Sequence, residues 1–257
     1  MKSTCYPLPE GSYTVGMDKK FIPFDELTDN IKDRPASLLV QIQPFLIKTP
    51  NSLLLLDCGL GYQLSNGQLH LHQNIRNCGF EPEEVTHVLL SHLHFDHVGG
   101  AVINHSGKLS TSFPNASYYA QQGELEKAQA HPSKSYRPEI LETLQKSGQL
   151  NLLQGNGMIG NEIHYEITGG HTEFHQAFTI TTGHEKFFFG GDVVPDLYQL
   201  IRRFVAKYDF DGKHSADMRR ELGIRAAEEG NTLLFYHSIK MPMCRLNYSE
   251  GIFSVAE

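Results

Sequence analysis

Apolar runs of strand length recur along the chain, and polar turns or segments with helical spacing separate them. The runs that predict strands are 38–47, 53–56, 86–90, 117–120, 163–168, 177–181, 186–189 and 232–236. Residues 49–52, Thr-Pro-Asn-Ser, form a turn signal between the first two runs. Several strands therefore follow each other directly, in adjacent pairs.

Helical patterns lie between other strands. Residues 121–130 and 138–146 read as helices, and a longer helix is expected to begin at a Ser215 cap and to end at Gly230-Asn231. Strands that occur both as neighbours and with helices between them predict a mixed α/β fold. There are no repeats, low-complexity tracts or breaks in composition, so residues 1–257 are expected to form a single domain.

Composition narrows the classes of function. Lys and Arg number 22 against 29 Asp and Glu, a net charge of -7, and basic residues occur at most in adjacent pairs. A surface that follows phosphates needs a basic face, so nucleic acid is not expected as a partner. No apolar run approaches the ~18 residues that span a bilayer, and the N-terminus lacks the pattern of a secretory signal. We therefore expect neither a membrane partner nor secretion.

The cysteines also indicate that the protein is not secreted. Cys5, Cys58, Cys78 and Cys244 are widely spaced and form no C-x-x-C motif. Free thiols are the simplest interpretation, and they are typical of a cytoplasmic protein.

The densest cluster of ligand-type side chains is SHLHFDHVGG at 91–100, directly after the predicted strand THVLL. His92 and His94 are two apart on an extended segment, so their side chains point the same way and can bind one metal ion. Asp96 and His97 are adjacent and lie beyond a bend, which places them better for a second ion. The alternative is a polar loop of solvated histidines.

Other predicted strands also end in a His or an Asp. EIHYEIT leads through Gly169-Gly170 to His171, KFFF leads through Gly190-Gly191 to Asp192, and TLLFY leads to His237. The carboxyl ends of strands are where sites assemble in α/β sheets. His171 can complete the first set and His237 the second, while Asp192 can bridge with its two oxygens. Imidazole and carboxylate ligands suit zinc, with manganese, iron or cobalt also possible.

Further histidines are weaker candidates. His175 follows His171 by four positions and is expected to support a ligand rather than to bind metal itself. His70 and His72 share the spacing of His92 and His94 but have no carboxylate beside them, so a surface or core position is expected for both.

The order and spacing of SHLHFDHVGG, GGHTEFHQ, FFFGGD and YH resemble the metallo-β-lactamase superfamily, and LLLLDCGLG is similar to its early strand ending in Asp-x-Gly. The resemblance implies an αβ/βα four-layer sandwich with metals at one edge. It also implies ligands for two metals. The first metal is bound by His92, His94 and His171, and the second by Asp96, His97 and His237. Asp192 would then bridge the two metals, and Asp57 would support the H-x-H-x-D-H loop.

Within this superfamily, the bridging Asp makes the chain resemble glyoxalase II and the quorum-quenching lactonases more than true β-lactamases. HTEFHQ is similar to the lactonases' H-T-P-G-H-Q, with Glu173-Phe174 in place of Pro-Gly. Pro195 stands where those lactonases carry a Tyr. The substrate is therefore left open by the resemblance.

The predicted chemistry is hydrolysis of a small-molecule ester, lactone, thioester or phosphoester by a hydroxide held between two divalent ions, most simply Zn²⁺. Asp96 is the expected catalytic residue, because it can orient the nucleophile and pass its proton to the leaving group. The alternatives are a mononuclear iron oxygenase of the persulfide-oxidising kind and a non-catalytic metal-binding protein. The aromatic loops 21–24 and 208–211 either line a pocket or pack in the core. The oligomeric state is not readable.

Overall fold

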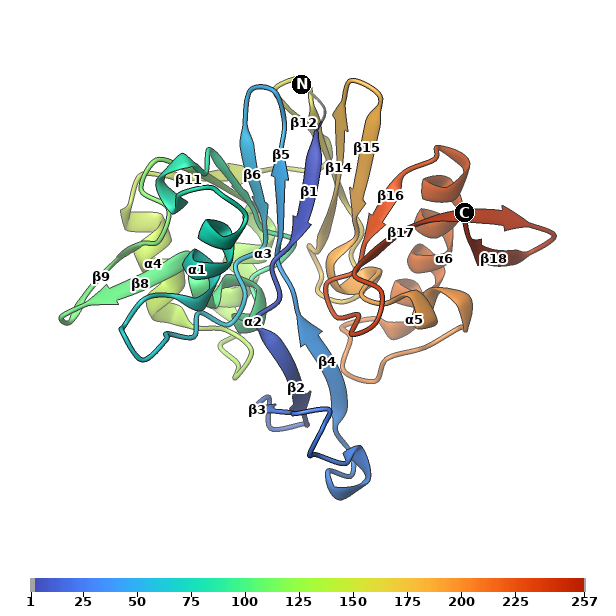
Figure 1. The fold of residues 1–257 in the computed structure, drawn as a ribbon, viewed down its shortest axis with the longest axis horizontal. Coiled ribbons are helices and arrows are strands. Elements are labelled where there is room, and N and C mark those ends of the chain that lie inside the picture. The colour runs from blue at the N-terminus through green and yellow to red at the C-terminus, as the bar shows by residue number, and fades with distance from the viewer. Residues whose placement is uncertain (1–2, 257) are drawn as a thin grey trace.

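The structure, a computed structural model, describes residues 3–256, in which two mixed β-sheets face each other between outer layers of helices (Figure 1). In spatial order the first sheet contains β1 (Thr4–Pro7), β5 (Phe45–Lys48), β6 (Leu53–Leu56), β7 (His87–Leu89), β10 (Ser117–Gln121) and β11 (Leu150–Leu153). Strands β6, β7, β10 and β11 are parallel to one another, whereas β1, β5 and β6 pair antiparallel.

The second sheet is antiparallel except where β15 and β16 run parallel. Its spatial order is β12 (Gly157–Ile159), β13 (Ile163–Ile167), β14 (Gln176–Thr182), β15 (Glu185–Phe189), β16 (Thr232–Leu234), β17 (Met243–Ser249) and β18 (Ile252–Val255). The parallel connection from β15 to β16 crosses over through the helices that cover this sheet, as a parallel pair requires.

Helices cover the outer face of each sheet (Figure 1). On the first sheet these are α1 (His70–Asn77), α2 (Phe95–Val98), α3 (Gln122–Ala130) and α4 (Pro138–Lys146), and on the second α5 (Leu197–Ile201) and α6 (Gly212–Glu228). Short 3₁₀ turns are η1 (Ile31–Asp33), η2 (Pro82–Glu84), η3 (Gly99–Ala101) and η4 (Gly191–Val193). The expected αβ/βα sandwich is thus confirmed.

The run LLLL of β6 shows why this sequence forms a central layer. Leu53 and Leu55 pack with the helices of the first sheet, while Leu54 and Leu56 pack between the sheets, and all four are buried. Alternate side chains of a strand point to opposite faces, so a strand covered on both faces needs an unbroken apolar run. Burying each such side chain contributes about 1.5–3 kcal/mol.

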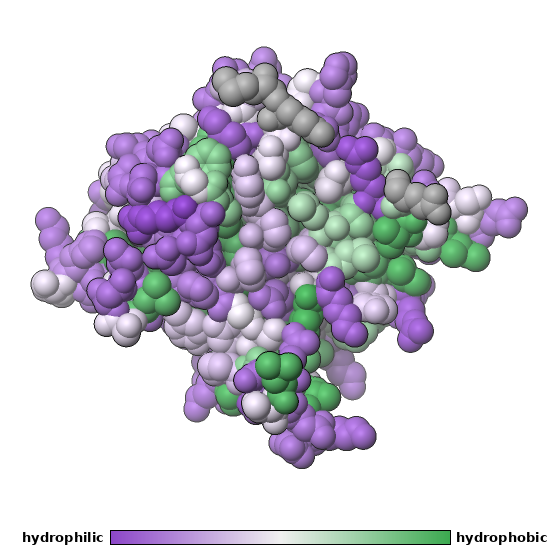
Figure 2. Space-filling model, viewed as in Figure 1, coloured by the Kyte–Doolittle hydropathy of each residue, from purple (hydrophilic) through white to green (hydrophobic). Residues whose placement is uncertain are grey.

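A smaller sheet projects from one edge of the sandwich (Figure 1). It contains β2 (Gly11–Val15), β3 (Phe21–Pro23) and β4 (Leu38–Ile42), in the order β3-β2-β4, and β8 (Val102–His105) and β9 (Lys108–Thr111) form a separate hairpin. Hydrophobic residues reach the surface of this projection (Figure 2), among them Ile22 at 51% and Leu27 at 94% exposure. Phe21 and Val40 of this sheet line the cavity at which the His and Asp residues gather.

The structure corrects two of the predicted elements. The run 38–47 is not one strand, because it divides at Gln43-Pro44 into β4 of the small sheet and β5 of the first sheet. Proline has no N–H to continue a ladder. The long helix is capped by Asp211, whose side chain accepts a hydrogen bond from the N–H of His214, and not by Ser215. Ser215 instead lies fully buried inside the first turns of α6.

No helix within residues 3–256 is long and apolar enough to cross a bilayer. The four cysteines are free, and burial raises the pKa of the Cys58 thiol.

Candidate metal centre

The H-x-H-x-D-H segment begins where β7 ends. His92 and His94 lie on the loop after the strand, and Asp96 and His97, which the sequence places beyond a bend, lie on the single helical turn α2. A backbone hydrogen bond from Cys58 N to His97 O, 2.6 Å long, joins this turn to the loop after β6. The segment is therefore attached at one end to β7, which precedes it, and at the other to the loop that follows β6.

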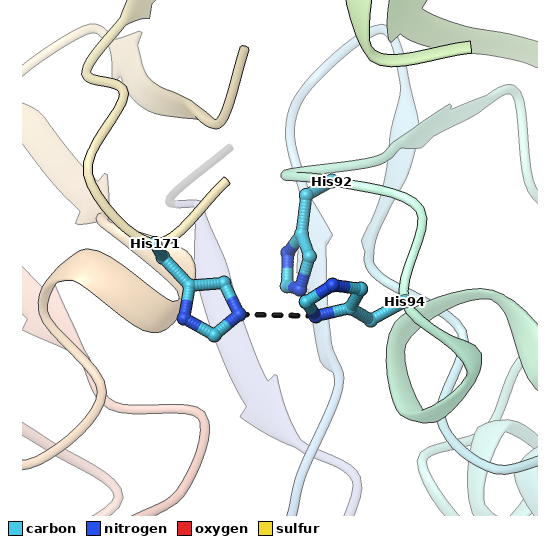
Figure 3. Close-up of side chains that lie close together, drawn as sticks. All are labelled: His92, His94 and His171. Carbon is cyan, nitrogen blue, oxygen red and sulfur yellow. Dashed lines mark hydrogen bonds between the residues drawn. The ribbon is translucent and has the colours of Figure 1, made fainter. Parts of the chain in front are cut away.

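The first group of side chains is His92, His94 and His171, which come from two different loops (Figure 3). Their rings point toward a common space, and ligand atoms from the three residues lie within 4.8 Å of one another. Nε2 of His171 is 3.0 Å from Nδ1 of His94. The structure thus brings His171 next to His92 and His94, the pair that the spacing of the motif predicts to bind one ion.

A second group lies beside the first. Asp96, His97 and His237 also place ligand atoms within 4.8 Å of one another. Asp192 lies between the groups: Oδ1 is 3.1 Å from Nε2 of His97 and 3.0 Å from Nε2 of His237, whereas Oδ2 is 3.2 Å from Nε2 of His171. One carboxylate therefore directs a different oxygen to each group.

Several polar atoms of these groups lack a partner. Within the described residues, Nε2 of His92, Nε2 of His97 and Oδ1 of Asp192 are buried without a hydrogen bond of acceptable geometry. Leaving a buried polar atom unpaired costs about 1–3 kcal/mol, and charged groups cost more. Orphaned imidazole and carboxylate atoms that converge in one place fit the donor set of a zinc-type ion.

The outer nitrogens of three of these imidazoles are occupied. Nδ1 of His97 donates to Oδ2 of Asp57 at 2.7 Å, and Nδ1 of His171 donates to Oδ1 of Asp209 at 2.8 Å. Nδ1 of His237 donates to the carbonyl oxygen of Gln41 at 2.8 Å. A proton held on Nδ1 leaves the lone pair on Nε2, directed to the common space, as metal-binding histidines require.

Asp57 supports the loop from below. Its side chain is fully buried and accepts hydrogen bonds from the N–H and the hydroxyl of Ser91, both 2.7 Å long, besides that of His97. Its backbone has φ +55°, in the left-handed region that non-glycine residues rarely adopt. Burial raises the pKa of Asp57, an effect that the neighbouring His97 opposes. Asp57 thus contacts His97 and the loop that carries His92, and its supporting role stays a prediction.

His175 lies beside Asp192, a candidate ligand of the kind that it was predicted to support. Its Nδ1 donates to the hydroxyl of Thr168 at 2.7 Å, and its Nε2 accepts the N–H of Asp192 at 3.1 Å. Gly191 has φ +46°, and a Cβ there would lie 2.7 Å from both Nε2 of His175 and Cβ of Ser91. Glycine is needed at this position for both its backbone angle and its close approach.

Burial and neighbouring charges set the protonation of the centre. Burial lowers the pKa of His92 well below its ordinary value and that of His94 to about 3, so both rings are neutral and can bind metal. Although burial alone would raise it, His237 and His97 hold the pKa of Asp192 well below its ordinary value. The carboxylate is therefore ionised.

Comparison with known proteins agrees with this geometry. The family profile of the metallo-β-lactamase superfamily matches residues 39–237, a range that includes both groups. The chain belongs to the metallo-β-lactamase superfamily. Relatives with solved structures cover nearly the whole chain. A probable metal-dependent hydrolase from Staphylococcus aureus has a TM-score of 0.78 and 21% identity over 100% of this chain and 99% of that one.

Named relatives of the superfamily include lactonases. The dizinc quorum-quenching lactonase AidC, solved with the product N-hexanoyl-L-homoserine, has a TM-score of 0.76 and 21% identity over 99% of this chain and 94% of that one. An N-acyl homoserine lactonase of a Bacillus species is 31% identical over 108 residues, 42% of this chain. The matched segment spans only 38% of that relative's length.

The structure adds residues around the superfamily's motifs that sequence reasoning missed. Asp209, in the loop before α6, orients His171, and the motif YDFD marked this loop only as aromatic. Glu124 accepts hydrogen bonds from Thr172 at 2.7 Å and from Leu93 N at 3.3 Å, so it ties the two histidine loops together. No local signal marks Glu124, because its partners lie far away in the sequence.

The weaker candidates lie elsewhere. His70 and His72 are on α1, outside the groups above, and His72 packs edge-on against Phe113 with ring centres 5.3 Å apart. These positions agree with the surface or core role expected for them.

Two adjoining cavities open at the centre, with volumes of about 130 and 330 Å³. Both are lined by Leu38, Val40, Asp192, Tyr208 and His237. The small sheet supplies one wall, which includes Phe21 in the first cavity, and Tyr208 faces it. Of the aromatic loops whose role was open, 21–24 and 208–211 therefore each contribute one residue to the pocket.

Proposed function

We propose that this member of the superfamily is a dinuclear metal-dependent hydrolase of a small-molecule ester, lactone, thioester or phosphoester. The observation that carries the proposal is the position of Asp192, which directs one oxygen to His97 and His237 and the other to His171. A carboxylate shared by two sets of unpaired imidazole atoms is suited to hold two cations at a short separation.

The proposed ligands follow the two groups. His92, His94 and His171 would hold the first ion, Asp96, His97 and His237 would hold the second, and Asp192 would contribute an oxygen to each. Zinc is the most suitable ion for this donor set, and manganese, iron or cobalt are possible substitutes. When bound, the ions supply a hydroxide nucleophile near neutral pH and polarise the oxygen of the bond to be broken.

Asp96 is the proposed catalytic residue. Its side chain lines the first cavity, and its carbonyl oxygen accepts a 2.6 Å hydrogen bond from the Tyr236 hydroxyl, which fixes the helical turn. Although burial opposes the change, His97 lowers the pKa of Asp96, so its carboxylate is ionised at neutral pH. An ionised carboxylate can orient the nucleophile, accept its proton and deliver that proton to the leaving group.

The two adjoining cavities suit a substrate that extends on both sides of the bond to be broken. They meet at Asp192 and Tyr208, so a bond placed there has room for a group on each side. A relative of similar fold was solved with N-hexanoyl-L-homoserine, which makes acyl lactones reasonable first substrates to test. The single-domain organisation and the cytoplasmic location stay predictions from the sequence.

Two other functions are weaker. A mononuclear iron oxygenase needs only the first group, so it does not explain why Asp96, His97 and His237 converge. A non-catalytic metal-binding protein does not explain the cavity beside Asp96. The arrangement of both groups therefore favours the hydrolase.

The deciding experiment combines metal analysis with a substrate screen. The purified protein is stripped with a chelator, reloaded separately with zinc, manganese and iron, and assayed for metal content. Each form is then tested on 4-nitrophenyl acetate, an acyl homoserine lactone, an acyl thioester and bis(4-nitrophenyl) phosphate. Two ions per chain and hydrolysis of one of these bonds are expected. One bound iron with consumption of oxygen would overturn the proposal in favour of the oxygenase.

A further inference from the structure

The charges that line the first cavity, apart from those of the metal groups, are all positive. Among the described residues around this cavity they are Lys19 and Lys134. The remaining wall is mostly apolar, with Val15, Phe21 and Leu38 as examples. This is unexpected in a chain whose net charge is -7.

Lys19 is placed by a tight turn between β2 and β3. Its N–H donates to the carbonyl oxygen of Gly16 at 3.0 Å, and its backbone has φ +59°. Its ammonium lies 5.4 Å from the centre of the Tyr208 ring, and that ring lies 6.3 Å from the ring of His171. The half-buried lysine is thus separated from the first metal group by a single aromatic side chain.

Lys134 lies on the loop between α3 and α4, which cover the first sheet, and it lines the same cavity. The next residue, Ser135, accepts a 2.7 Å hydrogen bond at its carbonyl oxygen from the N–H of Phe95, which directly precedes Asp96. The loop that carries Lys134 is therefore attached to the helical turn of the centre. The backbone beside Lys134 is thus attached to that turn, and its exposed side chain borders the cavity.

Neither ammonium forms an ion pair with a residue that the structure describes. Within residues 3–256, the lysine ion pairs are those of Lys127, Lys146 and Lys186. Lys19 and Lys134 thus border a cavity whose wall is mostly apolar outside the metal groups, and neither is paired with a carboxylate of the described residues. Coulomb attraction is several times stronger beside low-dielectric walls than in bulk water, so an anion that entered this space would be attracted to both.

We propose that Lys19 and Lys134 select a substrate in which a short apolar chain joins the bond to be broken to an anionic group, a carboxylate or a phosphate. The apolar wall contacts the chain, the ammonium groups bind the anion, and the reacting bond lies at Asp192. The part of this inference that concerns cleavage rests on the proposed hydrolase function, whereas recognition of the anion does not. Neutral acyl lactones are then poorer substrates than their anionic counterparts.

Binding can be measured without turnover. Isothermal titration of the zinc-loaded protein with heptanoate, heptanedioate and 6-phosphonohexanoate compares ligands that share one carboxylate and one chain and differ only at the far end. We expect the two dianions to bind at least about tenfold more tightly than heptanoate, as expected for a charge-assisted contact. The tighter of the two dianions identifies the preferred anionic group.

Variants assign the effect to the lysines. Lys19→Met and Lys134→Met keep most of the aliphatic stem, and each should reduce the preference for the dianions, while the double variant should abolish it. Lys20→Met is the matched control, because Lys20 is exposed and does not line the cavity. Equal affinities for heptanoate and both dianions in the unaltered protein would overturn the inference, as would a preference that survives in the double variant.

A turnover measurement separates this inference from the proposed function. Mono-4-nitrophenyl glutarate and 4-nitrophenyl valerate differ by a terminal charge, and the lysine variants should raise KM for the first alone. Hydrolysis of both esters with equal KM would contradict the anion selectivity and leave the hydrolase in place. No hydrolysis of either ester or of any substrate in the screen described above, together with tight binding of the dianions, would contradict the hydrolase and leave the anion site in place.

Discussion

His171 donates a hydrogen bond from Nδ1 to Oδ1 of Asp209 across 2.8 Å, and both side chains are almost fully buried, at 4% and 1% exposure. A backbone hydrogen bond from Phe210 N to His171 O, 3.0 Å long, runs beside it. The loop before α6 therefore fixes both the backbone and the ring orientation of His171. Through this contact, the helical layer of the second sheet positions one side chain of the candidate metal centre.

Replacing Asp209 with asparagine should weaken the first metal group. The amide side chain keeps a similar shape but lacks the charge that holds the proton on Nδ1 of His171. We expect Asp209→Asn to reduce zinc affinity or activity about 10–100-fold, the usual scale for a residue that supports a metal ligand. Competition with a chromophoric chelator measures the affinity. Asp217→Asn is the control, since Asp217 forms only an exposed ion pair with Arg203, and an equal loss there would sink the idea.

Asp192 and Asp57 should respond differently to the same substitution. Asp192→Asn removes the charge between two cations that sit about 3.5–4 Å apart in dinuclear sites, so their repulsion is no longer offset. At least one ion should be lost, together with all activity. Asp57→Asn keeps the acceptor for Ser91, and should retain both ions while activity or metal affinity falls about 10–100-fold. Metal content and turnover, measured side by side, test both; two ions and normal turnover in Asp192→Asn would show that the bridge is wrongly assigned.

Removing the metal should destabilise the fold without unfolding it. The proposed ligands come from loops of both sheets, so bound ions join distant parts of the chain and stabilise the folded state by mass action. The three apolar clusters that support the sheets consist of side chains that bind no metal, and they should remain intact. Chelation should lower Tm by several degrees and leave the far-UV circular dichroism unchanged. An unaltered Tm after verified metal removal would show that the ions do not stabilise the fold.

Glu10 should make stability depend on pH. Its carboxylate is buried beneath the turn after Asp57, where Oε2 accepts the N–H of Leu60 at 2.7 Å and Oε1 has no partner among the described residues. Burial raises the pKa of Glu10 from 4.5 to about 7. The folded state therefore holds a proton that the unfolded state releases above pH 4.5, and stability should fall as pH rises through this window.

A substitution isolates this effect. Glu10→Gln keeps the acceptor for Leu60 and removes the buried charge, so it should raise the free energy of unfolding at about pH 8 by up to about 3 kcal/mol and change it little at about pH 4.5. Denaturant titrations at both pH values provide the measurement. Glu26→Gln, at an exposed position, is the control. A gain of the same size at both pH values would mean that Glu10 does not titrate in this range.

The elements of the fold were readable from the sequence where they depend on local periodicity. The helices at 121–130 and 138–146 and the strand 53–56 appear within one residue of the predicted bounds, because apolar spacing along a few turns is enough to specify them. The run 38–47 was misread, since apolar spacing continues across Gln43-Pro44 while the chain passes from one sheet to another.

The sequence by itself also predicted which side chains gather at the candidate metal centre. H-x-H-x-D-H is a local pattern, and the ends of β13, β15 and β16 each lead to another His or Asp, so strand geometry alone predicts their convergence. Only the tertiary structure decided what surrounds them. Asp209 meets His171 and Lys19 approaches Tyr208 through loop contacts. Contacts between residues far apart in the chain depend on how whole layers pack, and no short window of sequence carries that information.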